Sequence, residues 1–182
     1  NPFKRMHLAE YVKNLYILTY LCPTDASGDY DLGLFEPRVA HAEWNKRYIP
    51  RIENIIPLIH QARCVLALSK VEGAMWASLE ALLCGVPVIT TRSKGGRSRY
   101  FTPQNSKIVR AHPAAVVRAV EYYKQHPPDP PKVRAAVLDR IEADRKRTVA
   151  FFCSKVLAKG KWSFAAVDDH LFRNRPDRLG KL

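Results

Sequence analysis

Glu72 and Glu80 are the residues of this 182-residue chain whose type and spacing best suggest a binding site. They lie eight positions apart, on either side of a predicted helix start near Trp76. The free N–H groups at a helix start carry about half a positive charge, which suits a phosphate, and Gly73 lets the backbone come close to a ligand. A carboxylate such as Glu80 only accepts hydrogen bonds, which suits a diol such as a ribose. The pattern therefore predicts a sugar-nucleotide site.

The elements around these glutamates are expected to be a strand, a loop, a helix and a second strand. The apolar run Cys64–Leu68 predicts the first strand, and the helix that carries Glu80 ends at Gly85. A buried strand then opens after Pro87. Because open α/β folds bind their ligands at the carboxyl ends of parallel strands, this unit puts both glutamates where a ligand is expected.

Helices and strands alternate along the rest of the chain, which predicts an α/β fold with a doubly wound parallel sheet. A polar, acidic loop is expected over Cys22–Glu36, and a turn over Arg97–Thr102. The other predicted elements are helices at Arg5–Lys13, Ile52–Ala62 and Pro113–Gln125 and strands at Leu15–Leu21 and Lys107–Val109.

The segment from Glu72 to Gly96 resembles the carboxyl-terminal half of GT-B glycosyltransferases, in particular glycosyltransferase family 4, the group 1 type. The signature of that family is a glutamate, seven residues, a second glutamate, a small-Gly-apolar-Pro-Val strand entry and a Gly-Gly loop. Glu72 and Glu80 match the glutamates, Gly85–Val88 matches the strand entry, and Gly95 and Gly96 match the loop.

Two features of the chain depart from that family's pattern. Ala74 and Met75 stand where the family usually has Phe and Gly, and Arg99 stands where many members carry an acidic residue.

The resemblance implies a Rossmann-like domain, here residues 1–126, that binds the donor in an enzyme that transfers a sugar from a nucleotide-sugar and retains its anomeric configuration. Glu80 would hold the nucleotide ribose. Lys4 would contact the diphosphate, with Arg5 as the alternative. Glu72 would position the donor sugar and act electrostatically, so Glu72 and Lys4 are the expected catalytic residues and no nucleophile is assigned. The remaining expected donor-binding residues are Gly73, Ala74, Met75, Trp76, Gly95 and Gly96.

Other functions stay open beside this one. Taken alone, Glu80 is equally compatible with an exposed helix position, and Glu72 could be a surface charge on the loop. The chain could also be a GT-B-like nucleotide-sugar epimerase, a domain that only binds a nucleotide-sugar, or a basic module that binds nucleic acid or membrane. The donor could be linked to UDP, GDP or ADP, and the acceptor could be lipid-linked or a saccharide.

The net charge of +13 is the clearest feature of the composition. Such an excess attracts phosphorylated donors, nucleic acid or anionic lipid. The basic residues are spread along the chain and form no nucleic-acid motif, so dedicated nucleic-acid binding is not expected. No apolar run is long enough to cross a membrane and the first residues are not a signal peptide, so we expect a cytoplasmic protein, with peripheral contact to the inner face of a membrane as an option.

The chain is expected to be a piece of a longer polypeptide. It begins with Asn1 rather than Met, and no complete strand precedes the first predicted helix. We therefore expect an amino-terminal acceptor domain that this chain lacks.

A proline-rich break is predicted over residues 127–131, because four of these five residues are prolines. Residues 132–182 are expected to form a long helix and a tail that packs on the same domain through Trp162, Phe164 and Phe172. The helix is predicted over Val133–Leu157 and serves either packing or a basic surface for a membrane or partner. Its predicted apolar positions are Val133, Val137, Ile141, Thr148, Phe152 and Val156, and its basic face is Arg134, Arg140, Arg145, Lys146 and Arg147.

No metal ion and no cofactor are expected. The residues from Asp25 to Glu36 place oxygen ligands at several positions of a calcium loop, but Tyr30 stands where that loop needs glycine. The histidines show no paired ligand spacing. The four cysteines are far apart in the sequence and predict buried, reduced thiols.

Overall fold

The computed structural model describes residues 4–18, 39, 41–45, 49, 51–73, 76–156 and 163–173. The chain divides into two compact units, Asn1–Val137 and Leu138–Leu182. Helix α4 (Pro130–Phe151) is continuous through the boundary. Among the described residues, no helix combines the length and the apolar character that a membrane crossing needs.

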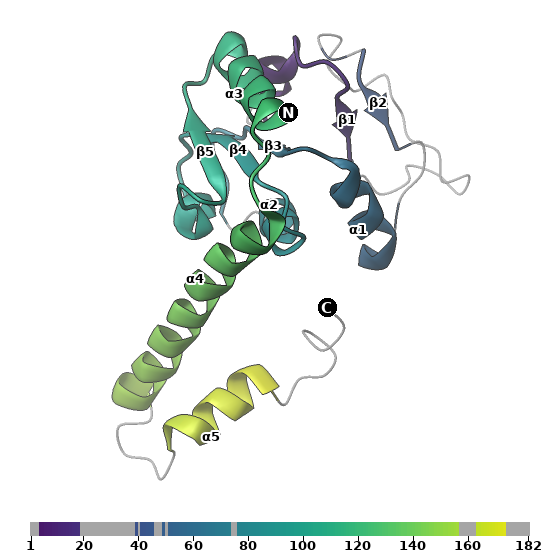
Figure 1. Ribbon diagram of the computed structural model, residues 1–182. Coiled ribbons are helices and arrows are strands. Elements are labelled where there is room, and N and C mark those ends of the chain that lie inside the picture. Colours follow the sequence, from purple (N-terminus) through teal and green to yellow (C-terminus); the bar gives the residue numbers. More distant parts are fainter. Residues whose placement is uncertain are drawn as a thin grey trace, which may run out of the picture. The chain divides into compact units, whose positions relative to one another are not determined.

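The centre of the first unit is a parallel sheet of three strands in the order β3 (Val65–Ala67), β4 (Val88–Thr91) and β5 (Ser106–Val109) (Figure 1). All four residues of β4 are buried, because this strand has a neighbour on each side and its side chains alternate between two faces that helices cover. Strands β1 (Tyr16–Ile17) and β2 (Glu43–Trp44) form a separate parallel pair.

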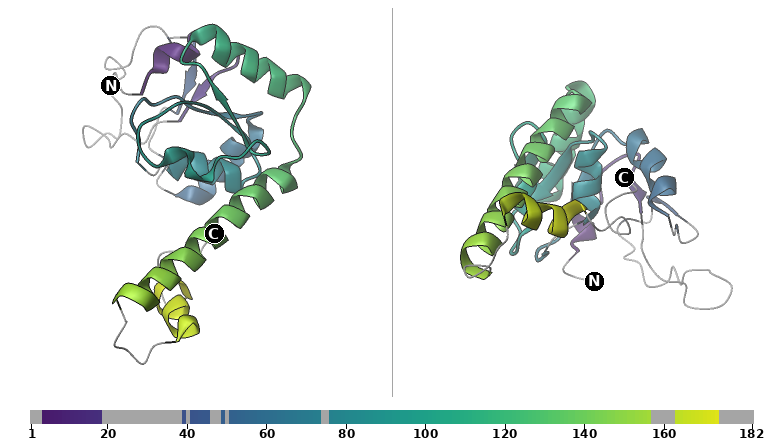
Figure 2. Two further views of the ribbon diagram at one scale, coloured as in Figure 1. Left: turned by 90° about the vertical axis from the view of Figure 1, so that its left-hand side faces the viewer. Right: turned by 90° about the horizontal axis from the view of Figure 1, so that it is seen from below.

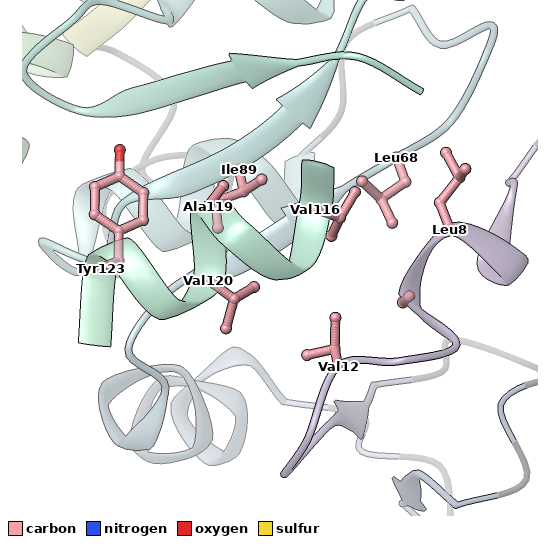
Figure 3. Close-up of a cluster of buried hydrophobic side chains, with 9 residues drawn as sticks. Leu8, Val12, Leu68, Ile89, Val116, Ala119, Val120 and Tyr123 are labelled. Carbon is pink, nitrogen blue, oxygen red and sulfur yellow. The ribbon is translucent and has the colours of Figure 1, made fainter. Parts of the chain in front are cut away.

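Helices cover both faces of this sheet. Helix α3 (Pro113–Gln125) lies on one face and α2 (Trp76–Leu83) on the other (Figure 2). The α3 face forms a core in which Val116, Ala119 and Val120 pack against Leu68 and Ile89 (Figure 3). Helix α1 (Ile52–Gln61) precedes β3 and buries Ile55 and Ile59.

These elements confirm the predicted α/β class and parallel sheet. The described sheet runs in chain order, so the strand-order reversal that defines a doubly wound sheet is not seen among the described residues and stays a prediction. The predicted elements at Ile52–Ala62, Cys64–Leu68, Lys107–Val109 and Pro113–Gln125 are confirmed within one residue at each end. The loop predicted over Cys22–Glu36 lies outside the described residues.

The predicted helix at Arg5–Lys13 is wrong in extent. Only a short 3-10 helix forms, at Met6–Ala9. Arg5, directly before this helix, has a φ of 50°, and Asn14, directly after the predicted segment, has a φ of 56°, so left-handed backbone bounds the segment on both sides. The strand predicted at Leu15–Leu21 is seen at Tyr16–Ile17, and residues 19–21 lie outside the described part.

The proline-rich break is shorter than predicted. Pro130 and Pro131 are the first two residues of α4. The first-turn N–H groups of a helix have no partner within the helix, so proline loses nothing there and its fixed φ is already helical. The sequence correctly predicted the long helix and its buried Val133 and Val137, but Thr148 is exposed and Val149 is buried in its place.

The second unit joins the end of α4 to α5 (Phe164–Asp168). Arg145 donates from Nε and Nη2 to the two carboxylate oxygens of Asp168 at 2.6 and 2.5 Å, and its guanidinium lies 5.2 Å from the ring centre of Phe172. Within this unit the tail thus returns to α4 through Asp168 and Phe172, whereas Phe164 is half exposed and Trp162 lies outside the described residues. Packing of the tail on the first unit stays a prediction. Because Arg145 is paired, the predicted basic face of α4 is smaller than the sequence indicated.

Gly85 controls how α2 ends. Its φ is 77°, and the N–H groups of Gly85 and Val86 donate to the carbonyls of Leu82 and Ala81, which closes the helix with a Schellman motif. A Cβ at Gly85 would lie 2.8 Å from the Cβ of Pro130 and 2.9 Å from its carbonyl oxygen. Residue 85 therefore has to be glycine for α2 and the start of α4 to pack together.

Replacing Gly85 with alanine should lower the free energy of unfolding by about 2 kcal/mol or more. The left-handed backbone costs an L-residue about 1–2 kcal/mol, and the collision with Pro130 adds an overpacking cost. Urea denaturation measures the change. The matched control is Gly73→Ala, where an added Cβ meets nothing within 4 Å. Equal stability losses in the two variants would contradict the packing argument.

Candidate functional site

The loops that follow β3 and β4 are joined by their backbones. The Glu72 N–H donates to the carbonyl of Lys94 at 3.0 Å, and the Lys94 N–H donates to the carbonyl of Lys70 at 2.9 Å. Val71 and Lys94 form a parallel bridge that extends the strand pairing past the sheet. The backbone at Glu72 is therefore fixed by the neighbouring loop.

Gly95 makes this joining possible. Its φ is 112°, and a Cβ there would overlap the carbonyl oxygen of Glu72. Only glycine has both the conformation and the room for this approach. Gly96 has no such constraint, since an added Cβ would lie 3.8 Å from the carbonyl oxygen of Gly73, an ordinary contact. The two glycines of the predicted loop thus have different roles.

A buried arginine holds the carboxyl ends of the two strands together. Arg97 is 2% exposed and belongs to the 3-10 helix Arg97–Tyr100. Its Nη1 donates to the carbonyl of Ser69 at 3.0 Å and its Nη2 to the carbonyl of Thr91 at 2.8 Å. Burial lowers the pKa of Arg97 and the charge of Glu72 opposes that effect. No hydrogen-bond partner for its Nε lies among the described residues.

Arg5, in the amino-terminal segment, forms hydrogen bonds with the same strand ends. Its Nε donates to the carbonyl of Leu68 at 2.7 Å, and its Nη2 lies 3.0 Å from the carbonyl oxygen of Ser69 and 2.5 Å from Oγ1 of Thr91. Neither structural role is predicted by the sequence, which places Arg97 in a turn and offers Arg5 only for phosphate binding. The sequence signal that could have indicated the role of Arg97 is its position directly after the Gly-Gly pair.

Lys4 and Glu72, the two expected catalytic residues, lie next to each other in the structure. The Nζ of Lys4 lies 3.0 Å from Oε2 of Glu72. Partial burial raises the pKa of Glu72, but hydrogen bonds from Lys4 and Ser69 and the charges of Lys4 and Arg97 outweigh it and leave the pKa below its ordinary value. Glu72 is therefore an ionised acceptor at the carboxyl end of β3.

The other predicted site residues lie on or near α2. Glu80 is half-buried on α2, and Trp76, its first residue, is 68% exposed. Gly73 is the last described residue before the helix, and Ala74 and Met75 lie outside the described residues. The helix start near Trp76 is confirmed.

In the described part of the chain, no group of three or more His, Cys, Asp or Glu side chains could hold a metal ion. The calcium-loop residues from Asp25 to Glu36 lie outside it. Burial raises the pKa of the Cys64 thiol to about 12, so this cysteine stays protonated at neutral pH.

A family model described as glycosyl transferase-like matches residues 24–150. The match covers the three-stranded sheet, the loop of Glu72, α2 and most of α4. No curated protein matches the chain.

Replacing Arg97 with alanine should lower the free energy of unfolding by about 2 kcal/mol, because the carbonyls of Ser69 and Thr91 each lose a hydrogen bond from a charged donor. Neither carbonyl is left unpaired, since Arg5 still donates to Ser69 and the Thr90 hydroxyl to Thr91. Arg63→Ala, at an exposed arginine, removes the same charge and should change stability by about 0.5 kcal/mol or less. Chemical denaturation of both variants is the measurement. An Arg97→Ala variant as stable as Arg63→Ala would refute the structural role.

The lowered pKa of Glu72 predicts a pH-dependent contribution to stability. A carboxyl whose folded pKa lies below its unfolded value, near 4.3, stabilises the fold above that value and loses the contribution as the pH falls through the folded pKa. The stability advantage of the wild type over Glu72→Gln should therefore be full above about pH 5 and shrink below it. Thermal unfolding between about pH 3 and 7 measures this difference.

The control for this prediction is the same comparison in a Lys4→Met background. Lys4 provides both a hydrogen bond and a charge that lower the pKa of Glu72, so removing it should flatten the pH dependence. A stability difference between wild type and Glu72→Gln that does not change with pH would argue against an ionised Glu72 held by Lys4.

Proposed function

The chain belongs to the glycosyl transferase-like family, and from this premise we propose that it is the donor-binding half of a retaining GT-B glycosyltransferase of family 4. Membership supports glycosyl transfer in general. The observation that carries the finer proposal is the joined pair of loops, in which Gly95 approaches the carbonyl of Glu72 and Lys4 pairs with its carboxylate. These contacts support the proposal because they bring an anionic side chain and a cation together in the loop that leads from β3 toward α2.

The proposed donor is a nucleotide-sugar linked to UDP, GDP or ADP. Glu80 on α2 accepts hydrogen bonds from the ribose hydroxyls. Glu72 and the backbone from Gly73 to the start of α2 hold the donor sugar. The exposed ring of Trp76, beside this loop, offers apolar surface to the donor, and an aromatic ring with one wet face is a common element of binding sites.

Lys4 is the proposed cation for the diphosphate. Its side chain is half exposed, and an exposed ion pair contributes only about 0–1 kcal/mol. Lys4 can therefore exchange Glu72 for a diphosphate at little cost. Arg5 is the weaker candidate, because its Nε and Nη2 are occupied by carbonyls and by Thr91.

The proposed mechanism is electrostatic. When the bond to the sugar breaks, negative charge grows on the departing diphosphate and positive charge grows on the anomeric carbon. Lys4 and the start of α2 stabilise the negative charge, and preorganised groups of this kind often contribute most to the rate enhancement of an enzyme. Ionised Glu72 positions the sugar and stabilises the positive charge. The acceptor, lipid-linked or a saccharide, would be recognised by an amino-terminal domain outside this chain.

The proposal is tested by calorimetric titration of the chain with UDP, GDP and ADP and with their sugar conjugates. We expect one nucleotide to bind, and Glu80→Gln to weaken it at least about tenfold, because a hydrogen bond to a charged group is worth about 1.5–3 kcal/mol. The matched control is Glu53→Gln, which removes an exposed carboxylate from the first turn of α1.

Three outcomes are informative. Equal affinity of wild type and Glu80→Gln for the nucleotide would refute the donor site. Glu80-dependent binding by a full-length protein that transfers sugar to no acceptor would favour an epimerase or a binding domain. Equal strengthening of nucleotide binding in both glutamate variants would point to the net charge of the chain rather than to a ribose contact, because each substitution removes one negative charge.

A further inference from the structure

A basic cavity of about 1020 Å³ lies where β5 leads into α3. Arg92, after β4, and Arg110, after β5, line it together with Arg118 of α3. Arg5 and His112 complete the polar lining. Residues from separate segments of the chain thus bring four guanidinium groups to one concave surface.

The positive charge of this cavity is not neutralised by the described part of the protein. No Asp or Glu is among the described residues that line it. Arg92, Arg110 and Arg118 are exposed, and none of them forms an ion pair with a described residue. In a chain of net charge +13, three clustered guanidiniums that have no carboxylate partner among the described residues attract an anion.

Arg5 contributes a group that is already oriented. Its Nε and Nη2 are held by strand-end carbonyls and by Thr91, while no hydrogen bond from Nη1 to a described residue is seen. The guanidinium is therefore fixed in place and still has donors for a ligand. A side chain held in this way loses little conformational entropy when it binds.

The start of α3 contributes the positive end of its helix dipole rather than hydrogen-bond donors. Pro113 has no N–H, the Ala114 N–H donates to Nδ1 of His112, and the next two N–H groups donate to the His112 carbonyl. An anion in the cavity would therefore be bound by the arginine side chains, with α3 adding the positive end of its dipole.

We infer that this cavity binds the phosphate groups of an organic ligand. Guanidinium donors match phosphate oxygens in pairs, and several guanidiniums suit a group that carries two or more negative charges. The volume exceeds the need of a single phosphate, and Val109, Ala114 and Ala115 give the wall an apolar part for the rest of the ligand. Neither Glu72 nor Glu80 lines the cavity, so its phosphate binding can be tested separately from the proposed function.

Two sources of such a phosphate share this chemistry. One is the diphosphate of the nucleotide donor, because Arg5 follows Lys4 directly and contacts the strand ends beside Glu72. The other is a second, phosphorylated ligand. The experiment separates them through Glu80, which the donor site needs and the cavity does not.

The test is calorimetric titration of the chain with inorganic pyrophosphate and with UDP at low ionic strength. Wild type should bind pyrophosphate with a dissociation constant below about 1 mM. The double variant Arg110→Gln and Arg118→Gln should weaken binding at least about tenfold, as expected for lost charged hydrogen bonds. The matched control neutralises two exposed arginines outside the cavity, Arg63→Gln with Arg140→Gln.

The control double variant should bind pyrophosphate no more than about twofold more weakly than wild type, because the two charges that it removes lie outside the cavity. Equal weakening in both double variants would overturn the site, and so would wild-type binding weaker than about 1 mM. Arginine-dependent pyrophosphate binding that persists in Glu80→Gln and in the presence of UDP assigns the phosphate to a second ligand. UDP binding that needs Glu80 and both arginines assigns the phosphate to the nucleotide donor. The proposed donor site and the proposed phosphate cavity can therefore be refuted independently.

Discussion

The structure of this site depends on one interaction, the capture of strand-end carbonyls by two guanidiniums. A parallel strand that stops at a loop leaves carbonyl groups without a partner, and burying them unpaired is costly. Arg97 and Arg5 both donate to the carbonyl of Ser69, and each also contacts Thr91. Because arginine keeps its charge and carries several donors in a fixed plane, it can serve two strands at once.

The close approach of the two loops follows from that capture. Once the ends of β3 and β4 are held together, the chain beyond them can continue the parallel pairing, and Lys94 bonds on both sides to the loop of Glu72. The remaining obstacle is steric, and Gly95 removes it. Glu72 thereby receives a rigid backbone, a neighbouring Lys4 and a depressed pKa from groups that are distant in sequence.

The elements whose signals are local could be predicted from the sequence. Glycine at the end of α2, apolar runs at β3 and β4 and proline at the start of α3 each act within a few residues, and these elements are confirmed. The features that could not be predicted depend on contacts with distant residues. The burial of Arg97 depends on carbonyls 6 and 28 positions away along the chain. A charged residue gives no local sign that such partners exist. In α4, the helical spacing of apolar residues fits Thr148 and the adjacent Val149 within one residue. Which of the two is buried depends on the residues that pack against the helix. Val149 is buried, and the Thr148 hydroxyl donates to the carbonyl of Asp144.

The left-handed backbone at Arg5 explains how two successive cations serve different purposes. A φ of 50° is strained for an arginine and persists only where the surroundings compensate for it. The hydrogen bonds from Arg5 to Leu68, Ser69 and Thr91 supply that compensation. Lys4, one residue earlier, is left to pair with Glu72 at the surface. Arg5 is therefore held in place by the strand ends, whereas Lys4 stays at the surface, where the proposed contact with a diphosphate needs it.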